Sequence, residues 1–426
     1  MQRRRNLAAP IHKLPIEVMV MIFAAYSKSS PLAYYPSLLD LTTVNKLWYD
    51  AIVYSPQLWT VLESDFSPKI AKLVIERSKA LPLSLVWHDK ERNEQEEQEL
   101  ERFLALVVQH SHRFKSINMI FPEWENLIGR ELLQSKLPRL EKLRVKALWD
   151  STLEEQLVKF ELQNGPPLRE IALDTVFLAS WSSPRLIGLF ALDLTGPIQS
   201  PSVEELLDIL SNSPQLERLR LCDLDCSGSS WKRPLKGIIT LPRLQEIVVD
   251  NPSGPYLSAI LTTVYAPASK NVCVRGYLDN DYSATMFDEV CTPGNNQLKA
   301  LLGLEDSGLP TEEVPLPITI VVKSSVARIV RSGDAEEREM AFYFHGHLSA
   351  RIVNLLGQFF LAVPQVPAVD LTIGVAASSW GGAVFDLLPW TRSLRTLSVH
   401  DSGVCRSAVK QLGEQTEDAV KGVLTW

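Results

Sequence analysis

Apolar side chains recur in the first sixty residues at the spacing of short amphipathic helices. The first run repeats every three or four residues, at Val18, Met19, Ile22 and Phe23. It predicts a helix that begins near Leu14 and Pro15, because the N–H that proline lacks would have no partner in a first helical turn. A second run predicts a helix over residues 37–51, which ends before Ser55-Pro56.

This helical segment carries more apolar surface than it can enclose. Trp48 and Trp59 accompany a large set of aliphatic side chains. Roughly fifty residues cannot seal two tryptophans and about ten aliphatic side chains in a core of their own. Some of these side chains must therefore pack against the rest of the chain or against a partner.

From about residue 111 a different pattern repeats, Leu-x-x-Leu-x-Leu after a proline or a polar break. Clear copies lie at 137–145, 167–173, 213–221 and 241–249, and weaker copies at 114–119, 184–189 and 393–399. Each Leu-x-Leu places two aliphatic side chains on one face of a short strand. A single copy cannot bury that face, whereas stacked copies can. The repeats are spaced by twenty-odd residues, which is the period of leucine-rich repeats.

The pattern is less regular beyond residue 250. Prolines interrupt residues 252–267, strands are predicted near 272–274 and 318–322, and residues 303–317 look like a loop insertion. Residues 341–361 and 369–375 are expected to resume the alternation of helix and strand.

Four short pieces of the first sixty residues resemble the F-box, a small helical module. They match it in order and spacing at Leu14-Pro15, Ile22-Phe23, Val44-Asn45-Lys46-Leu47-Trp48 and Pro56-Gln57-Leu58-Trp59. Asn45 departs from the pattern, which usually has cysteine there, and its polarity predicts a less dry point within the helix. The resemblance implies a three-helix F-box over residues 8–62.

By the same resemblance, the F-box would bind a Skp-family adaptor protein and, through it, the cullin scaffold of a ubiquitin ligase. The residues expected to bind the adaptor are Leu14, Pro15, Ile16, Val18, Ile22, Val44, Trp48, Leu58 and Trp59. Some of them are expected to be internal. On helical spacing alone all of them would form an ordinary core, and the combined motif is what favours the adaptor.

The later repeats resemble the irregular leucine-rich repeats that often follow an F-box in fungal and other eukaryotic proteins. The expected fold is α/β, an F-box followed by a solenoid with a curved parallel sheet and outer helices. Residues 63–110 would form a helical linker and the first repeats, and residues 111–426 the leucine-rich-repeat-like domain. The chain would then be the substrate-recognition adaptor of a Skp-cullin-F-box E3 ubiquitin ligase. The alternative is an interaction protein that pairs with the Skp-family adaptor without joining a ligase.

The outward positions of the predicted strands are rich in charge, and these residues are the candidates for binding an unknown protein substrate. The candidates are Lys142, Arg144, Arg218, Arg220, Glu246 and His400, with Lys146 and Asp250 on the same face. Basic residues on neighbouring strands would suit an acidic or phosphorylated partner. Charged strand faces also serve solubility, which is the commoner case.

Composition narrows the remaining possibilities. The net charge of -7, from 43 basic and 50 acidic residues, argues against general nucleic-acid binding. Five scattered cysteines form no metal-ligand pairs and indicate reduced thiols in the cytosol or nucleus. Prolines or polar residues interrupt the uncharged runs at 251–269 and 352–369, which predicts no membrane span. We expect no signal peptide, and an end at Trp426 suggests either a short cap or a truncated product.

The sequence predicts no catalysis and no cofactor. It contains no Gly-x-Ser-x-Gly and no glycine-rich phosphate loop. The histidine pairs at 110 and 112 and at 345 and 347 are expected to be structural, because zinc generally needs four ligands. A second alternative is an enzyme site within residues 250–390, which would require His345, His347 and Asp370 to converge.

Overall fold

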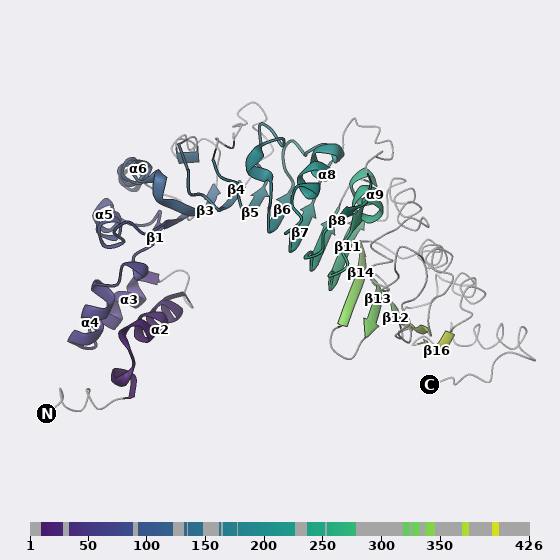
Figure 1. Ribbon diagram of the computed structural model, residues 1–426, viewed down its shortest axis with the longest axis horizontal. Helices are drawn as coiled ribbons and strands as arrows, with labels where there is room; N and C mark the ends of the chain where they lie inside the picture. The colour runs from purple at the N-terminus through teal and green to yellow at the C-terminus, as the bar shows by residue number, and fades with distance from the viewer. Residues whose placement is uncertain are drawn as a thin grey trace, which may run out of the picture. The chain divides into compact units, whose positions relative to one another are not determined.

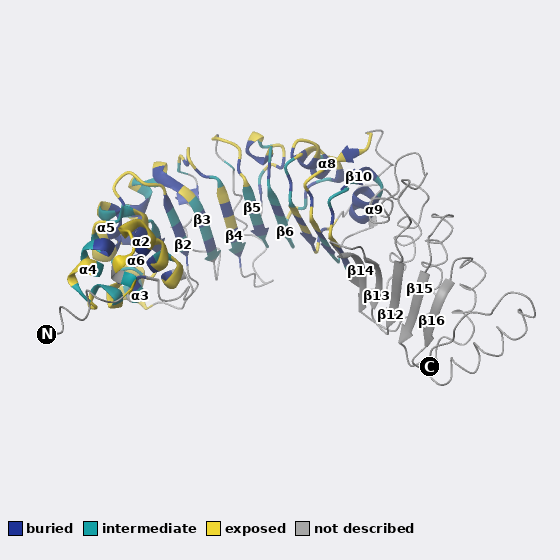
Figure 2. Ribbon diagram, turned by 60° about the horizontal axis from the view of Figure 1, so that its bottom comes forward, coloured by how far each residue is buried: buried dark blue, intermediate teal, exposed yellow. Residues whose placement is uncertain are grey.

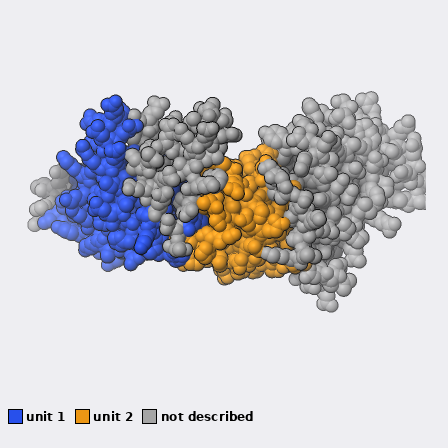
Figure 3. All heavy atoms as spheres, turned by 90° about the horizontal axis from the view of Figure 1, so that it is seen from above, with its two compact units in different colours: residues 1–166 blue, residues 167–426 orange. Residues whose placement is uncertain are grey.

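In a computed structural model the chain folds into two compact units, Met1–Pro166 and Pro167–Trp426 (Figure 3). The structure describes residues 10–28, 34–87, 93–121, 132–133, 135–147, 162, 165–176, 178–225, 237–251 and 254–277, and the backbone of 318–323, 326–332, 337–345, 369–374 and 394–399. Each unit combines helices with parallel strands, as predicted for an α/β fold (Figure 1). The predicted segments 8–62 and 63–110 both lie in the first unit.

Short helices precede the first strand of unit 1. Their bounds are η1 Pro10–Lys13, α2 Ile16–Lys28, α3 Tyr34–Thr42, α4 Lys46–Val53 and η3 Pro56–Leu58. The carbonyl of Pro15 accepts the N–H of Met19, so α2 starts where the sequence predicted, and Glu17 lies in its first turn.

The prediction of a single helix over residues 37–51 was wrong. The structure has two helices there, and Thr43, Val44 and Asn45 separate them. The Thr43 hydroxyl donates to the carbonyl of Asp40, which lies in the last turn of α3. Short polar side chains of this kind compete with the helical backbone for hydrogen bonds, and this is why they favour helix ends.

The remainder of unit 1 alternates helices with parallel strands. The elements are β1 Val61–Glu63, α5 Pro68–Arg77, β2 Leu83–Trp87, α6 Glu94–Gln109, η4 Ser111–Arg113, β3 Phe114–Phe121 and β4 Lys142–Ala147. The strands pair in chain order, so that one row of the sheet reads Leu62, Leu85, Ile117 and Leu143. Every member of this row is at most 2% exposed. The row is therefore the apolar core that joins the strands of the unit.

An aromatic cluster joins the helices of unit 1 to its sheet. Tyr35 of α3 stacks on Trp59 with ring centroids 5.5 Å apart, and the Phe66 ring meets Tyr35 edge-on at 5.1 Å. The Arg77 guanidinium of α5 lies over the Trp59 ring, 4.4 Å from the ring centroid. The helical segment and the first strands thus share one core.

Unit 2 repeats the strand pattern with a more regular spacing. The elements are β5 Glu170–Asp174, η6 Pro184–Leu186, β6 Ala191–Thr195, α8 Val203–Ser211, β7 Arg218–Cys222, β8 Ile239–Thr240, β9 Glu246–Asp250, α9 Gly254–Thr263, β10 Val264–Tyr265 and β11 Asn271–Tyr277. Strands β5, β6, β7, β9 and β11 are parallel neighbours, and β8 pairs separately with β10. Helices α8 and α9 lie along one side of these strands (Figure 1). One row of buried side chains crosses the sheet, formed by Ile171, Leu192, Leu219, Ile247 and Val272.

The residues that follow β5, β6, β7 and β9 turn the chain in the same way. Thr175, Gly196, Asp223 and Asn251 all have positive φ angles, of 56°, 48°, 51° and 44°. The N–H of each donates to a main-chain carbonyl of the next strand at 2.8–2.9 Å. The acceptor is the last residue of the strand for the first three, and Arg275 of β11 for Asn251. We call this turn at Thr175, Gly196, Asp223 and Asn251 the corner. Its geometry is repeated although its residue type changes from copy to copy.

The last described strands depart from the predicted parallel order. They are β12 Ile318–Lys323, β13 Val326–Ser332, β14 Glu337–His345, β15 Val369–Gly374 and β16 Leu394–Val399, and they follow β11 in the order β14-β13-β12-β15-β16. Strand β13 is antiparallel to both of its neighbours. Strands were correctly predicted near 272–274, 318–322 and 393–399, whereas the antiparallel pairs of β13 were not foreseen. Of the segments expected to resume the alternation of helix and strand, 341–345 and 369–374 are strands. Residues 346–361 and the loop predicted at 303–317 lie outside the described residues.

Candidate functional site

Helix α2 is apolar on two opposite sides. Met19, Val20 and Phe23 face the core and are at most 4% exposed. On the other side Val18, Met21, Ile22 and Tyr26 are 38–71% exposed (Figure 2). Met21 and Ile22 follow Val18 by three and four residues, and Tyr26 follows Ile22 by four. Leu14 and Ile16, at the start of the helix, are exposed as well. Contiguous exposed apolar side chains are typical of protein interaction sites.

Helices α3 and α4 add further exposed apolar side chains. These are Leu39, Val44, Leu47, Tyr49 and Tyr54. Trp48 of α4 is intermediate in exposure, and its ring lies 5.0 Å from that of Phe23 on α2. Trp48 therefore contributes to the contact between the two helices while keeping part of its surface in solvent. We call the exposed apolar residues of α2, α3 and α4 and their connecting turns the helical surface.

Six of the nine residues predicted to bind an adaptor belong to the helical surface. Leu14, Pro15, Ile16, Val18, Ile22 and Val44 are exposed, and Trp48 is partly exposed. Met21, Tyr26, Leu39, Leu47, Tyr49 and Tyr54 were missed. The helical spacing of Met21 and Tyr26 relative to Val18 and Ile22 would have placed them on the same side of α2.

The assignment of Leu58 and Trp59 to the binding surface is corrected, because both lie in the core. Leu58 is 0% and Trp59 2% exposed. The indole N–H of Trp59 donates to the carbonyl of Ile52 at 2.8 Å, and its ring is covered by Tyr35 and Arg77. These two residues support the helical surface from inside the unit.

Asn45 has a local role that the sequence analysis did not foresee. It lies at the N-terminus of α4 in an extended conformation, and its side-chain oxygen accepts the N–H of Trp48 at 3.0 Å. Asparagine is among the best residues for this capping position. The polar side chain is therefore explained by a helix end, and not by a less dry point within a helix.

The charged side of the strands differs between the two units. In unit 1, Lys142, Arg144 and Lys146 alternate along β4 beside Ser116, Asn118 and Ile120 of β3. In unit 2, Arg218 is in register with Glu246, and Arg220 with Asp193. Arg275 forms an ion pair with Asp250 at 3.5 Å. The basic residues expected on neighbouring strands are therefore not continued in unit 2, where basic and acidic side chains alternate. His400 lies outside the described residues.

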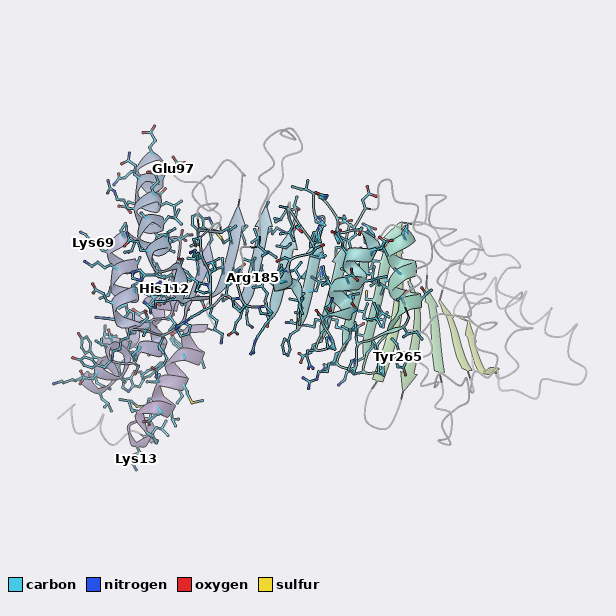
Figure 4. All side chains as sticks on the ribbon, turned by 45° about the horizontal axis from the view of Figure 1, so that its top comes forward. Lys13, Lys69, Glu97, His112, Arg185 and Tyr265 are labelled. Carbon is cyan, nitrogen blue, oxygen red and sulfur yellow. The ribbon has the colours of Figure 1, made fainter. Side chains whose placement is uncertain are left out.

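Three ionisable side chains are buried away from these surfaces. Burial lowers the pKa of Arg185, which is 1% exposed (Figure 4), and burial together with Arg139 lowers that of Arg113. Burial raises the pKa of Glu63 to about 7, and the charge of Asp65 adds to this effect. Glu63 ends β1 and is 8% exposed. Its carboxyl is therefore partly protonated near neutral pH.

Comparison with protein-family models and with curated proteins found no match.

The residues named for a possible enzyme site do not come together as far as they are described. Asp370 of β15 is in register with Glu339 of β14, six positions before His345. Two strands separate β14 from β15, which corresponds to roughly 14 Å between their backbones. His347 lies outside the described residues. This arrangement gives no support to a site shared by His345 and Asp370.

The described residues also offer little to a metal or to thiol chemistry. Among them, no group of three or more His, Cys, Asp or Glu side chains could hold a metal ion. The ring centroids of His110 and His112 lie 6.3 Å apart. Burial raises the pKa of the Cys222 thiol, which accepts a hydrogen bond from Nε of Arg220 at 3.5 Å. Within this part of the chain, no helix is long and apolar enough to cross a membrane.

Proposed function

We propose that the chain is an F-box adaptor that binds a Skp-family protein through the helical surface. The observation that carries the proposal is the second apolar side of α2, with Val18, Ile22 and Tyr26 exposed opposite the buried Met19 and Phe23. A helix with one apolar side is explained by the core beneath it. An additional exposed apolar side of this kind favours a protein partner, and the F-box resemblance suggests which partner.

Apolar burial would supply most of the binding energy. Removing apolar surface from water contributes about 25 cal/mol per Å², and a few central side chains usually dominate. Val18 and Ile22 are the strongest candidates for such anchors, because Ile22 lies at the middle of α2 and Val18 lies one turn before it on the same exposed side. Trp48, which is intermediate in exposure, would contribute through the part of its surface that is left in solvent.

The strand faces would hold a protein substrate, and the whole would act in the cytosol or nucleus. The repeated corners at Thr175, Gly196, Asp223 and Asn251 favour a leucine-rich-repeat solenoid for unit 2, because each repeat ends with the same backbone turn. In a ligase complex the chain would raise the effective concentration of a substrate lysine near the ubiquitin thioester. Its own residues would bind and position, and the chemistry would occur on other subunits.

Ile22→Glu tests the helical surface, with Ile238→Glu as a matched control. Both isoleucines are exposed, at 40% and 52%, and Ile238 lies in unit 2. Ile22→Glu should weaken binding to a recombinant Skp-family adaptor at least tenfold in calorimetry. Ile238→Glu should leave this affinity unchanged. Both variants should keep the circular dichroism spectrum of the wild type. Failure of the wild-type chain to bind would reject the proposal. Equal affinity of Ile22→Glu and wild type would reject this surface.

Co-purification separates a ligase subunit from the alternative role. Affinity purification of the full chain from cells should recover the adaptor together with a cullin and ubiquitin if the complex is a ligase. Adaptor without cullin would favour an interaction protein that never joins a ligase. The Ile22→Glu variant serves as the background for both measurements, because it should recover neither partner.

A further inference from the structure

The turn between α3 and α4 is held by hydrogen bonds at every step. The hydroxyls of Thr42 and Thr43 donate to the carbonyls of Leu39 and Asp40, at 2.6 and 2.7 Å. The N–H of Val44 donates to the carbonyl oxygen of Leu41 at 3.3 Å. The turn therefore has a defined geometry, and its last residue, Asn45, decides where α4 begins.

Asn45 starts α4 through both its side chain and its backbone. Its side-chain oxygen accepts the N–H of Trp48 at 3.0 Å, and its carbonyl accepts the N–H of Tyr49 at 3.0 Å. Its φ and ψ of -167° and 171° are extended, as expected of a residue that precedes the first helical turn. Without the side-chain acceptor, the first N–H groups of α4 would depend on water.

Asn45 directly follows one residue of the helical surface, Val44, and lies three residues before Trp48, which is partly exposed beside that surface. Val44 precedes it and is 48% exposed. Trp48 lies in the first turn of α4, where the capped N–H is its own, and packs on Phe23. Fraying of this turn would release the Trp48 backbone and with it the orientation of the ring.

We infer that Asn45 is a positioning residue for the α4 part of the helical surface, fixing Val44 and Trp48 for the partner. The inference rests on the proposed adaptor function. It assigns Asn45 a favourable effect on docking, because its side chain orders the first turn of α4. It also implies that cysteine, the residue usual at this place in the F-box pattern, would serve this chain less well, because a thiol is a weak acceptor.

The test compares three substitutions at Asn45 with a capping substitution elsewhere. Ser202→Ala is the matched control, since Ser202 caps α8 in unit 2 by accepting the N–H of Glu205 at 3.1 Å. Loss of a cap typically destabilises the helix end by ~1 kcal/mol, which corresponds to about fivefold in an equilibrium constant. Asn45→Ala and Asn45→Cys should therefore weaken affinity for a recombinant Skp-family adaptor about fivefold. Asn45→Asp should restore it, because aspartate caps equally well, and Ser202→Ala should leave it unchanged.

Amide hydrogen exchange on the free full-length chain tests whether Asn45 orders the start of α4 separately from whether the chain binds an adaptor. Asn45→Ala should raise the exchange rates of the Trp48 and Tyr49 amides about fivefold, whether or not an adaptor binds. Unchanged exchange would overturn the positioning role. Faster exchange with wild-type adaptor affinity would also overturn it, as would an equal loss of affinity in Ser202→Ala. A wild-type chain that binds no adaptor would reject the proposed function and, with it, the role of Asn45 in docking.

Discussion

The hydroxyl of Tyr35 donates to the carbonyl oxygen of Val61 at 2.7 Å, and the N–H of Val61 donates back to the same hydroxyl at 3.3 Å. One side chain of α3 thus satisfies both backbone groups of the first residue in β1. This pair, together with the stacking of Tyr35 on Trp59, fixes the helical segment to the edge of the sheet in unit 1.

Tyr35→Phe should destabilise unit 1 without disturbing its packing. The ring remains, but the partly buried N–H and carbonyl of Val61 lose their partner, which costs about 1–2 kcal/mol. The free energy of unfolding from urea titration should fall by this amount. Tyr54→Phe, at a tyrosine that is 73% exposed, should leave it unchanged, and an equal fall in that variant would argue against the specific bond.

Arg113→Ala should weaken the end of α5. The guanidinium of Arg113, which is 6% exposed, donates to the hydroxyl of Ser78 at 2.7 Å and to the carbonyls of Leu81 and Ile75 at 2.9 and 3.4 Å. Its removal leaves several acceptors without a hydrogen-bond donor at once. We therefore expect the free energy of unfolding to fall by about 3 kcal/mol. Arg102→Ala, on the exposed side of α6, is the control and should change it by less than about 0.5 kcal/mol.

Glu63→Gln should alter the pH dependence of stability. The pKa of Glu63 rises from its ordinary 4.5 to about 7 in the folded chain. The folded state therefore binds more protons than the unfolded state between these values, and the free energy of unfolding falls as pH rises through this range.

Glutamine should remove that fall. Near pH 4 the variant should match the wild type, and at pH 8 its free energy of unfolding should be higher by up to ~3 kcal/mol. Hydrogen exchange of the β1 amides at both pH values measures the difference locally. A variant that is less stable than the wild type at pH 8 would contradict the assignment.

Gly196→Ala should destabilise unit 2 through its backbone conformation. Gly196 has a φ of 48°, and a Cβ there would meet Thr175 Oγ1 at an ordinary 3.9 Å. The cost is thus conformational and amounts to about 1 kcal/mol. Gly237→Ala, where an added Cβ meets nothing within 4 Å, is the control. Thermal unfolding should show a lower midpoint for the first variant alone.

The sequence predicted the start of α2 and most of the strands, because periodic apolar spacing reports which residues share a side. It did not identify the buried side of α2, since Val18 and Ile22 are as apolar as Met19 and Phe23. The choice depends on what packs beneath the helix, and residues remote in the chain supply it. Trp59 was misplaced for the same reason, because its cover comes from Tyr35 and Arg77.

The break between α3 and α4 and the corners of unit 2 were missed for different reasons. Leu38, Leu41 and Val44 continue a helical period through the break, so that only the hydrogen-bonding preferences of Thr43 and Asn45 signalled it. At the corners, left-handed backbone is imposed on residues as different as Thr175 and Asp223. Packing of successive strands sets this conformation, and residue type alone carries little signal for it.

The repeated corner has a consequence for how freely this chain can change. Its recurring bond joins a main-chain N–H to a main-chain carbonyl of the following strand, and every amino acid except proline carries that donor. Mutation can therefore replace almost any corner side chain while the turn persists. The cost is the conformational free energy of placing a residue other than glycine in the left-handed region. An architecture of this sort can therefore persist while the residues at its corners change.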